Sequence, residues 1–193
     1  MDYFTPKTFN IPALKGISAK NIEEHLKLYA GYVKFTNYIQ NQIKELSKDA
    51  EKNSYEIAEL TRRFAFEHDG MKNHEIYFSQ FEGGPSKIGA ESMLSKQIEK
   101  DFGSFDTCLA RLKALAMTRG VGWAMLYYCP DSGHLLAHWV DEQHVGHLYG
   151  PHIVLAVDMW EHSFVADYQP SGKKQYVEDF FANLNWQVVE NRF

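Results

Sequence analysis

The chain has little or nothing of several features that mark large classes of proteins. Its 193 residues include two cysteines, Cys108 and Cys129, and no CxxC pair, so neither a disulfide framework nor a thiolate zinc site is indicated. No apolar segment is long enough to cross a membrane, and the sequence begins without a basic region followed by an apolar stretch. The net charge of −5 is opposite to that of a typical nucleic-acid binder. We therefore expect a cytoplasmic protein that binds neither membranes nor nucleic acid.

The chain does have the material for a substantial core. Apolar residues make up 45% of it and aromatic residues 15%, and its length suffices for one large domain or two small packed ones. Nine histidines in an acidic chain are the other unusual feature. Since imidazole is a frequent metal ligand, they direct attention to a metal site.

The first half of the sequence has the periodicity of helices. Ser18 caps a long helix that runs to about residue 46, and Ser54 opens a second one that runs to about residue 78. A polar turn separates them, and Gly83-Gly84-Pro85 ends the second. Two shorter helices are predicted at about 88–101 and 104–117.

The second half adds strands. Apolar stretches at 121–129 and 134–140 flank the turn Pro130-Asp131-Ser132-Gly133, which predicts a hairpin. A third strand is predicted at 152–157, followed by helices from Glu161 and at about 174–184. We therefore predict an α+β fold, with a long α-hairpin domain at residues 1–84 and an α/β domain at residues 85–193 that has a small three-stranded antiparallel sheet.

The run Asp158-Met159-Trp160-Glu161-His162 is the most informative motif. It follows an apolar strand and places a carboxylate and an imidazole four residues apart. A buried carboxylate is costly without a counter-charge or a metal. If the two long helices pair as a hairpin, each can add one histidine, which would give the set His25, His74, Asp158 and His162. Such a nitrogen and oxygen shell suits iron or manganese.

These motifs resemble the iron/manganese superoxide dismutase family along nearly the whole chain. Asp158 to His162 resembles its aspartate-x-tryptophan-glutamate-histidine signature, and Asn73-His74 and Gly122-Trp123 resemble two further family segments. The resemblance implies that the four residues above bind the metal between the two domains, in an enzyme that disproportionates superoxide. It also implies further site residues, namely Tyr32 at the substrate funnel, Gln143 beside the bound solvent, and Trp123, Trp160 and Tyr29 around them.

The same resemblance implies a homodimer, and a tetramer is possible. Glu161 resembles the glutamate that reaches the partner subunit's metal-ligand histidine, here the residue corresponding to His162. For the ion, Gly70 and Gln143 resemble manganese forms, whereas Ala156 matches neither type. Manganese is slightly preferred, with iron or use of both ions close behind.

Four alternatives stay open from the sequence. An ungapped comparison with the family would place Glu24, not His25, at the first ligand position, because His25 precedes Tyr32 by seven residues instead of eight. His144 competes with its neighbour Gln143. A metal-free structural or assembly protein of the same fold is the alternative function, and a metallohydrolase is a weaker one because no extra general base is evident.

Overall fold

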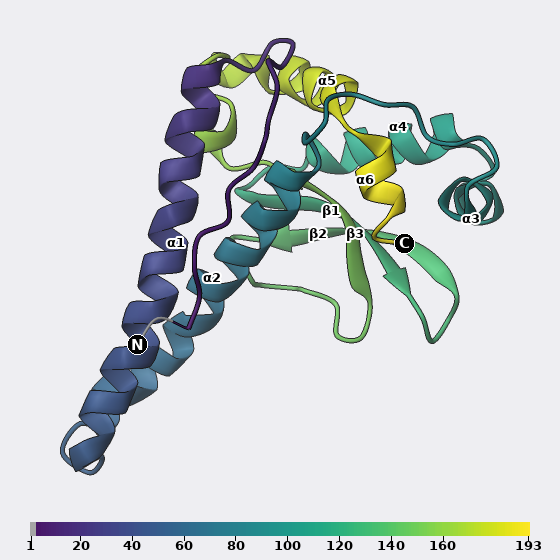
Figure 1. The fold of residues 1–193 in the computed structure, drawn as a ribbon. Helices are drawn as coiled ribbons and strands as arrows, with labels where there is room; N and C mark the ends of the chain where they lie inside the picture. The colour runs from purple at the N-terminus through teal and green to yellow at the C-terminus, as the bar shows by residue number, and fades with distance from the viewer. Residues whose placement is uncertain (1–2) are drawn as a thin grey trace.

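The computed structural model describes residues 3–193 and begins with a long helical hairpin (Figure 1). Helix α1 (Ala19–Leu46) and helix α2 (Ser54–Ser79) run antiparallel and are joined by the short 3₁₀ helix η1 (Ser47–Asp49). The Ser18 hydroxyl accepts a hydrogen bond from the backbone N–H of Asn21 at 3.1 Å, which caps α1. Both predicted long helices are confirmed, and the hairpin projects beyond the rest of the molecule (Figure 1).

The hairpin buries one face of each helix near its base. On α1 the buried positions recur every three or four residues, as an amphipathic helix requires, and on α2 they are concentrated in the second half, from Glu67 to Phe78. Two histidines, His25 and His74, lie on these buried faces and are 1% and 0% exposed. One nitrogen of each ring has a hydrogen-bond partner, the Gly70 carbonyl for His74 and the Asp158 carboxylate for His25. The other nitrogen of each ring is buried without one, which is costly unless a ligand meets it.

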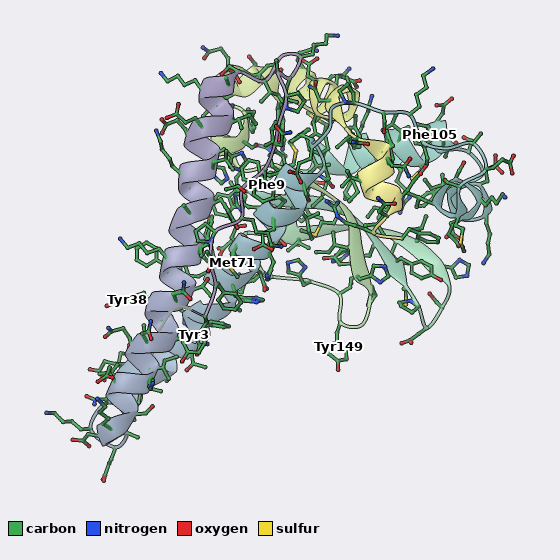
Figure 2. All side chains as sticks on the ribbon, viewed as in Figure 1. Tyr3, Phe9, Tyr38, Met71, Phe105 and Tyr149 are labelled. Carbon is green, nitrogen blue, oxygen red and sulfur yellow. The ribbon has the colours of Figure 1, made fainter. Side chains whose placement is uncertain are left out.

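The segment before α1 runs along the helical hairpin (Figure 1). The side chain of Asn37 accepts hydrogen bonds from the backbone N–H groups of Tyr3 and Phe4 and donates one to the Phe4 carbonyl at 2.7 Å. Further along, the Tyr29 hydroxyl accepts a bond from the Lys7 N–H at 2.9 Å. Phe9, labelled in Figure 2, packs its ring 5.4 Å from that of Phe78. The segment therefore covers the apolar seam between α1 and α2.

The second half contains the predicted three-stranded antiparallel sheet, with strand order β2-β1-β3. Its strands are β1 (Gly122–Cys129), β2 (His134–Asp141) and β3 (His152–Asp158). The central strand β1 is buried over its first six residues, and β3 over its last five. Trp123 pairs with Asp158 in the register, so the sheet delivers an indole and a carboxylate to the same end. The predicted α+β class is confirmed.

Helices pack around the sheet: α3 (Met93–Phe102), α4 (Phe105–Ala116), α5 (Lys173–Asn183) and α6 (Trp186–Glu190). Two predicted boundaries are wrong. Helix α3 begins five residues later than predicted, because Ser92 provides the N-cap and residues 88–92 form a turn anchored by the bond from the Gly89 N–H to Glu190. None of the helices in residues 3–193 is long and apolar enough to cross a membrane.

The second wrong prediction is the helix beginning at Glu161. The chain forms only the 3₁₀ helix η2 (Glu161–Ser163) there, followed by turns and the 3₁₀ helix η3 (Pro170–Gly172). The Ser163 hydroxyl bonds back to the carbonyls of Asp158 and Trp160, at 3.0 and 2.6 Å. A serine side chain that satisfies the backbone in this way competes with regular helix. The short turn keeps His162 next to the end of β3.

Candidate metal centre

Four side chains from four separate elements meet at the base of the hairpin. They are His25 of α1, His74 of α2, Asp158 at the end of β3 and His162 of η2, and one ligand atom of each lies within 4.8 Å of all the others. The Asp158 Oδ2 atom lies 3.1 Å from His25 Nε2, 3.2 Å from His162 Nε2 and 3.5 Å from His74 Nε2. Three imidazoles thus surround a single carboxylate oxygen.

These separations fit one shared ion. Two atoms each about 2.1 Å from a metal lie about 3.0 Å apart at a right angle and about 3.6 Å apart at 120°, which brackets the three measured distances. The Nε2 atom of His74 is buried and has no hydrogen-bond partner. A buried nitrogen without a partner destabilises the folded protein unless a ligand binds to it. The donor set, with three nitrogens and one oxygen, suits iron or manganese.

Two ligands are oriented by hydrogen bonds on their far sides. His74 Nδ1 lies 2.6 Å from the Gly70 carbonyl oxygen and must donate to it, so in the neutral ring Nε2 carries the free lone pair. The Asp158 Oδ1 atom accepts a bond from the Trp160 N–H at 2.8 Å, which directs Oδ2 toward the histidines. Tyr176 donates to the Asp158 carbonyl at 2.9 Å and anchors the end of the strand. Such outer contacts fix the orientation of metal ligands.

Burial and charge set the protonation of the cluster in the direction that metal binding needs. Burial lowers the pKa of His74 to about 3 and also lowers the pKa of His25, against the opposing attraction of Asp158. Burial alone would raise the pKa of Asp158, but the charge and hydrogen bonds of His162 and His25 hold it below its usual range. Neutral His25 and His74 facing an ionised Asp158 are protonation states that bind a cation.

The structure places His25, and not Glu24, in the cluster. The His25 side chain is fully buried, whereas the Glu24 side chain is 58% exposed and pairs with Lys27 at 2.9 Å. The one-residue difference in spacing from Tyr32 is therefore absorbed along a regular α1 helix, where adjacent residues differ by about 100°.

Gln143 lies beside the cluster, between Tyr32 and Trp123. Its Nε2 donates to the Tyr32 hydroxyl and its Oε1 accepts from the Trp123 indole N–H, both at 2.9 Å. The rings of Tyr32 and Trp123 each lie 5.1 Å from the His74 ring. His144, the competing residue, instead packs its ring 5.7 Å from that of Phe66. The buried Gln143 amide is therefore joined to two side chains that contact His74, whereas the half-buried His144 contacts Phe66.

Aromatic rings form the walls of the site. The Trp160 ring stacks on His162 at 5.7 Å and 22°, and Trp123 is fully buried behind His74. Phe66 contacts both Tyr32 and Trp160, with its ring 6.0 Å from that of Tyr32 and 6.4 Å from that of Trp160. These walls reduce the polarity around the cluster and limit the approach of solvent.

Three supporting residues had no predicted role, namely Phe66, Asn73 and Tyr176. Phe66, Gly70 and His74 are spaced by four residues on α2, so helical periodicity could have placed Phe66 above the site. Asn73 bonds to a residue 70 positions away in the sequence, and Tyr176 bonds to one 18 positions away. No local sequence pattern predicts these contacts.

Tyr29 and Glu161 are the remaining residues for which the family resemblance implies a place near the metal or at a dimer interface. The Tyr29 hydroxyl faces the N-terminal segment and Glu75, with Oε1 3.4 Å away, so its polar atom is turned from the four ligands. Glu161 is exposed, next to the half-buried His162. Its position leaves it accessible to a second subunit.

Within residues 3–193, fold and site together define a protein with four side chains that could hold a metal ion, between a helical hairpin and a small sheet. Residues 90–192 match the family of iron/manganese superoxide dismutases, C-terminal domain. An iron superoxide dismutase of Aquifex pyrophilus is 36% identical over 185 residues, which cover 93% of this chain and 85% of that protein. A manganese superoxide dismutase of Mycolicibacterium smegmatis is 34% identical over 172 residues, covering 88% and 80%. The chain belongs to the iron/manganese superoxide dismutase family, and its relatives include proteins named for either ion.

Proposed function

We propose that this protein is a superoxide dismutase whose iron or manganese ion is held by His25, His74, Asp158 and His162. The observation that carries the proposal is the convergence of three imidazoles on one carboxylate oxygen, with a buried His74 nitrogen that has no hydrogen-bond partner. In the reaction one superoxide is oxidised to oxygen, and a second is reduced and takes up two protons to give hydrogen peroxide.

The ion, when bound, would supply a one-electron couple between its divalent and trivalent states. The negative charge of Asp158 favours the higher oxidation state of the ion. Gln143 adjusts the balance through its amide, which Tyr32 and Trp123 hold in place. These residues therefore govern the reduction potential.

Tyr32 is suited to donate a hydrogen bond to the substrate. Its oxygen accepts the hydrogen bond from Gln143 Nε2, so its own O–H remains available to donate. Burial raises the pKa of Tyr32, and the charge of Asp158 raises it further, so the hydroxyl keeps its proton at neutral pH. A protonated hydroxyl at the edge of the site can hydrogen-bond to the reduced substrate.

An ion pair lies close to this hydroxyl. The Arg63 guanidinium lies 3.6 Å from the centroid of the Phe66 ring, which contacts Tyr32, and 2.9 Å from the Glu67 carboxylate. Superoxide is a small anion, and a positive charge near the site of a negatively charged protein increases its rate of capture, but Glu67 offsets much of the charge of Arg63.

We extend the proposal to the domain boundaries, the oligomeric state and the location of the protein. We infer two domains, residues 1–84 and 85–193, because each contributes two of the four ligands to the seam. We also infer a homodimer through exposed Glu161 and its neighbour His162, with a tetramer as a further possibility. We infer a cytoplasmic location as well, because both cysteines are free. Sedimentation of the wild type and of Glu161→Ala tests the dimer, which the substitution should weaken.

The experiment that tests the function compares one protein loaded separately with manganese, iron and zinc. Zinc accepts similar ligands but has no redox chemistry, so it separates a structural or hydrolytic site from a redox one. We expect rapid superoxide decay, approaching about 10⁸ M⁻¹ s⁻¹, with manganese or iron and none with zinc. If neither manganese nor iron binds and gives turnover, the metal-free assembly role becomes the better reading.

A further inference from the structure

The backbone of Gln143 is held from two sides. Its carbonyl oxygen accepts a hydrogen bond from Asn73 Nδ2 at 2.9 Å, and His147 Nε2 lies 3.2 Å away. A carbonyl oxygen can only accept, so the His147 Nε2 atom carries a proton and donates it. One donor comes from α2, and the other comes from the loop between β2 and β3 that contains Gln143 itself.

The opposite nitrogen of His147 identifies its tautomer. Burial lowers the pKa of His147, so the ring is neutral at pH 7 and its Nδ1 atom is an acceptor. Tyr127 supplies the donor, with its hydroxyl oxygen 2.6 Å from Nδ1. Tyr127 lies on β1 and is 1% exposed. A continuous chain of hydrogen bonds therefore runs from the core of the sheet through His147 to Gln143.

This contact survives a change in the charge of His147. Protonated His147 would keep its Nε2–H toward Gln143 and would donate through Nδ1 to the Tyr127 oxygen, while the Tyr127 O–H turned to Met125 Sδ at 3.2 Å. The titratable groups that face His147 are Asp69 from α2, His138 from β2 and His144 from its own loop. Neither protonation state requires Gln143 to move.

The residue before Gln143 shows why such support is needed. Glu142 has a φ of 50°, the one positive value among the non-glycine residues 3–193, and this conformation is unfavourable for a residue with a Cβ. Its N–H donates to the Val121 carbonyl at 3.1 Å, and its own carbonyl accepts from the Trp160 indole at 3.1 Å. A strained turn that presents a site residue persists only when its surroundings fix it.

We propose that His147, oriented by Tyr127, is a positioning residue that fixes the Gln143 amide between Tyr32 and Trp123. This inference rests on the proposed function only for its effect on the metal, since the hydrogen bonds exist without it. Losing the His147 donor would leave Asn73 as the single remaining donor to the Gln143 carbonyl. The amide would then move relative to the ion, and the reduction potential would change while the four ligands stayed in place.

The test compares His147→Leu and Tyr127→Phe with the matched control His138→Leu, all as metal-loaded full-length protein. His138 also bonds a carbonyl of this loop, that of Gly146 at 2.8 Å, but does not contact Gln143. For His147→Leu we expect the reduced-to-oxidised ratio at a fixed potential to change about tenfold, which is about 59 mV for a one-electron couple. Tyr127→Phe should give a smaller shift of the same sign, His147→Asn should restore part of it, and His138→Leu should give none.

Hydrogen exchange supplies a readout that does not depend on the metal reaction. The amides of Glu142 and Val145 are hydrogen-bonded in this turn and should exchange about tenfold faster in His147→Leu, and at the wild-type rate in His138→Leu. The inference would be overturned if the reduction potential and the amide exchange rates of His147→Leu equalled those of the wild type. Equal changes in His138→Leu would overturn it as well. If His147→Leu does not fold, the same comparison is made with Tyr127→Phe. A wild type without any redox couple would refute the proposed function instead, and the exchange result would still decide the role of His147.

Discussion

The Nε2 atom of His25 lies 3.1 Å from the Oδ2 atom of Asp158, although 133 residues separate them in the chain. One comes from the first turns of α1 and the other from the end of the last strand. Both side chains are fully buried. The whole fold is therefore required to bring them together, and metal binding should be coupled to the integrity of both halves.

Asp158→Asn should abolish metal binding. The substitution keeps the size of the side chain but removes the charge that offsets a divalent or trivalent ion, so we expect metal content and superoxide turnover to fall more than about 100-fold. Metal analysis by mass spectrometry and a superoxide decay assay measure both. Asp131→Asn, in the exposed turn between β1 and β2, is the control and should resemble the wild type. A folded Asp158→Asn protein with normal turnover would contradict the assignment.

Gln143→Asn should separate metal binding from turnover. The shorter side chain cannot keep both hydrogen bonds, to Tyr32 and to Trp123. Because Gln143 is not one of the four ligands, we expect near-normal metal content with activity lowered by about 10- to 100-fold. Parallel metal analysis and kinetics provide the comparison. Loss of the metal together with the activity would instead show that Gln143 holds the centre intact.

Gly70→Ala should disturb Tyr32. A Cβ at this position would lie 2.7 Å from a carbon of the Tyr32 ring, so the ring would have to shift, at a cost of about 1–3 kcal/mol in the free energy of unfolding. Gly31→Ala is the matched control, because nothing lies within 4 Å of its added Cβ. Alanine there should stabilise α1 by about 0.5–1 kcal/mol. Urea unfolding distinguishes the two, and equal effects would show that the Tyr32 contact yields freely.

The metal-free protein should lose stability in mild acid. Burial lowers the pKa of His74 from its ordinary 6.5 to about 3, so in this range the unfolded chain takes up a proton that the folded chain refuses. The contribution of His74 is present above pH 6.5 and is lost progressively as the pH falls toward 3. Urea midpoints measured at several pH values should fall less steeply in His74→Gln than in the wild type. If the urea midpoints of the two proteins fell equally with decreasing pH, His74 would be able to take up a proton in the folded protein.

The sequence was most informative where a pattern was local. The Ser18 cap, the two amphipathic helices and the turn at Pro130 to Gly133 determine their elements through nearby contacts, and all three predictions are confirmed. The prediction of a helix from Glu161 was wrong because the Ser163 hydroxyl bonds to backbone carbonyls. The periodicity of apolar residues carries no information about such a bond. The spacing from His25 to Tyr32 was ambiguous for a related reason, since only the packed hairpin shows which of two adjacent residues faces inward.

The supporting contacts of the site lay beyond what the sequence could provide. Asn73 and His147 meet at the Gln143 carbonyl from segments 70 and four residues away, and Tyr127 reaches His147 across 20 residues. Each of these bonds depends on the register of β1 and on the path of one loop. The motif from Asp158 to His162 indicated the chemistry, but its geometry depends on tertiary structure.

Anomalous X-ray scattering from crystals of the purified protein, recorded on both sides of the iron and manganese absorption edges, tests the central assignment most directly. We predict a single peak per chain at one of these edges, within bonding distance of His25 Nε2, His74 Nε2, Asp158 Oδ2 and His162 Nε2. A peak located elsewhere, or full occupancy of this position by an ion without redox chemistry in an active preparation, would contradict it.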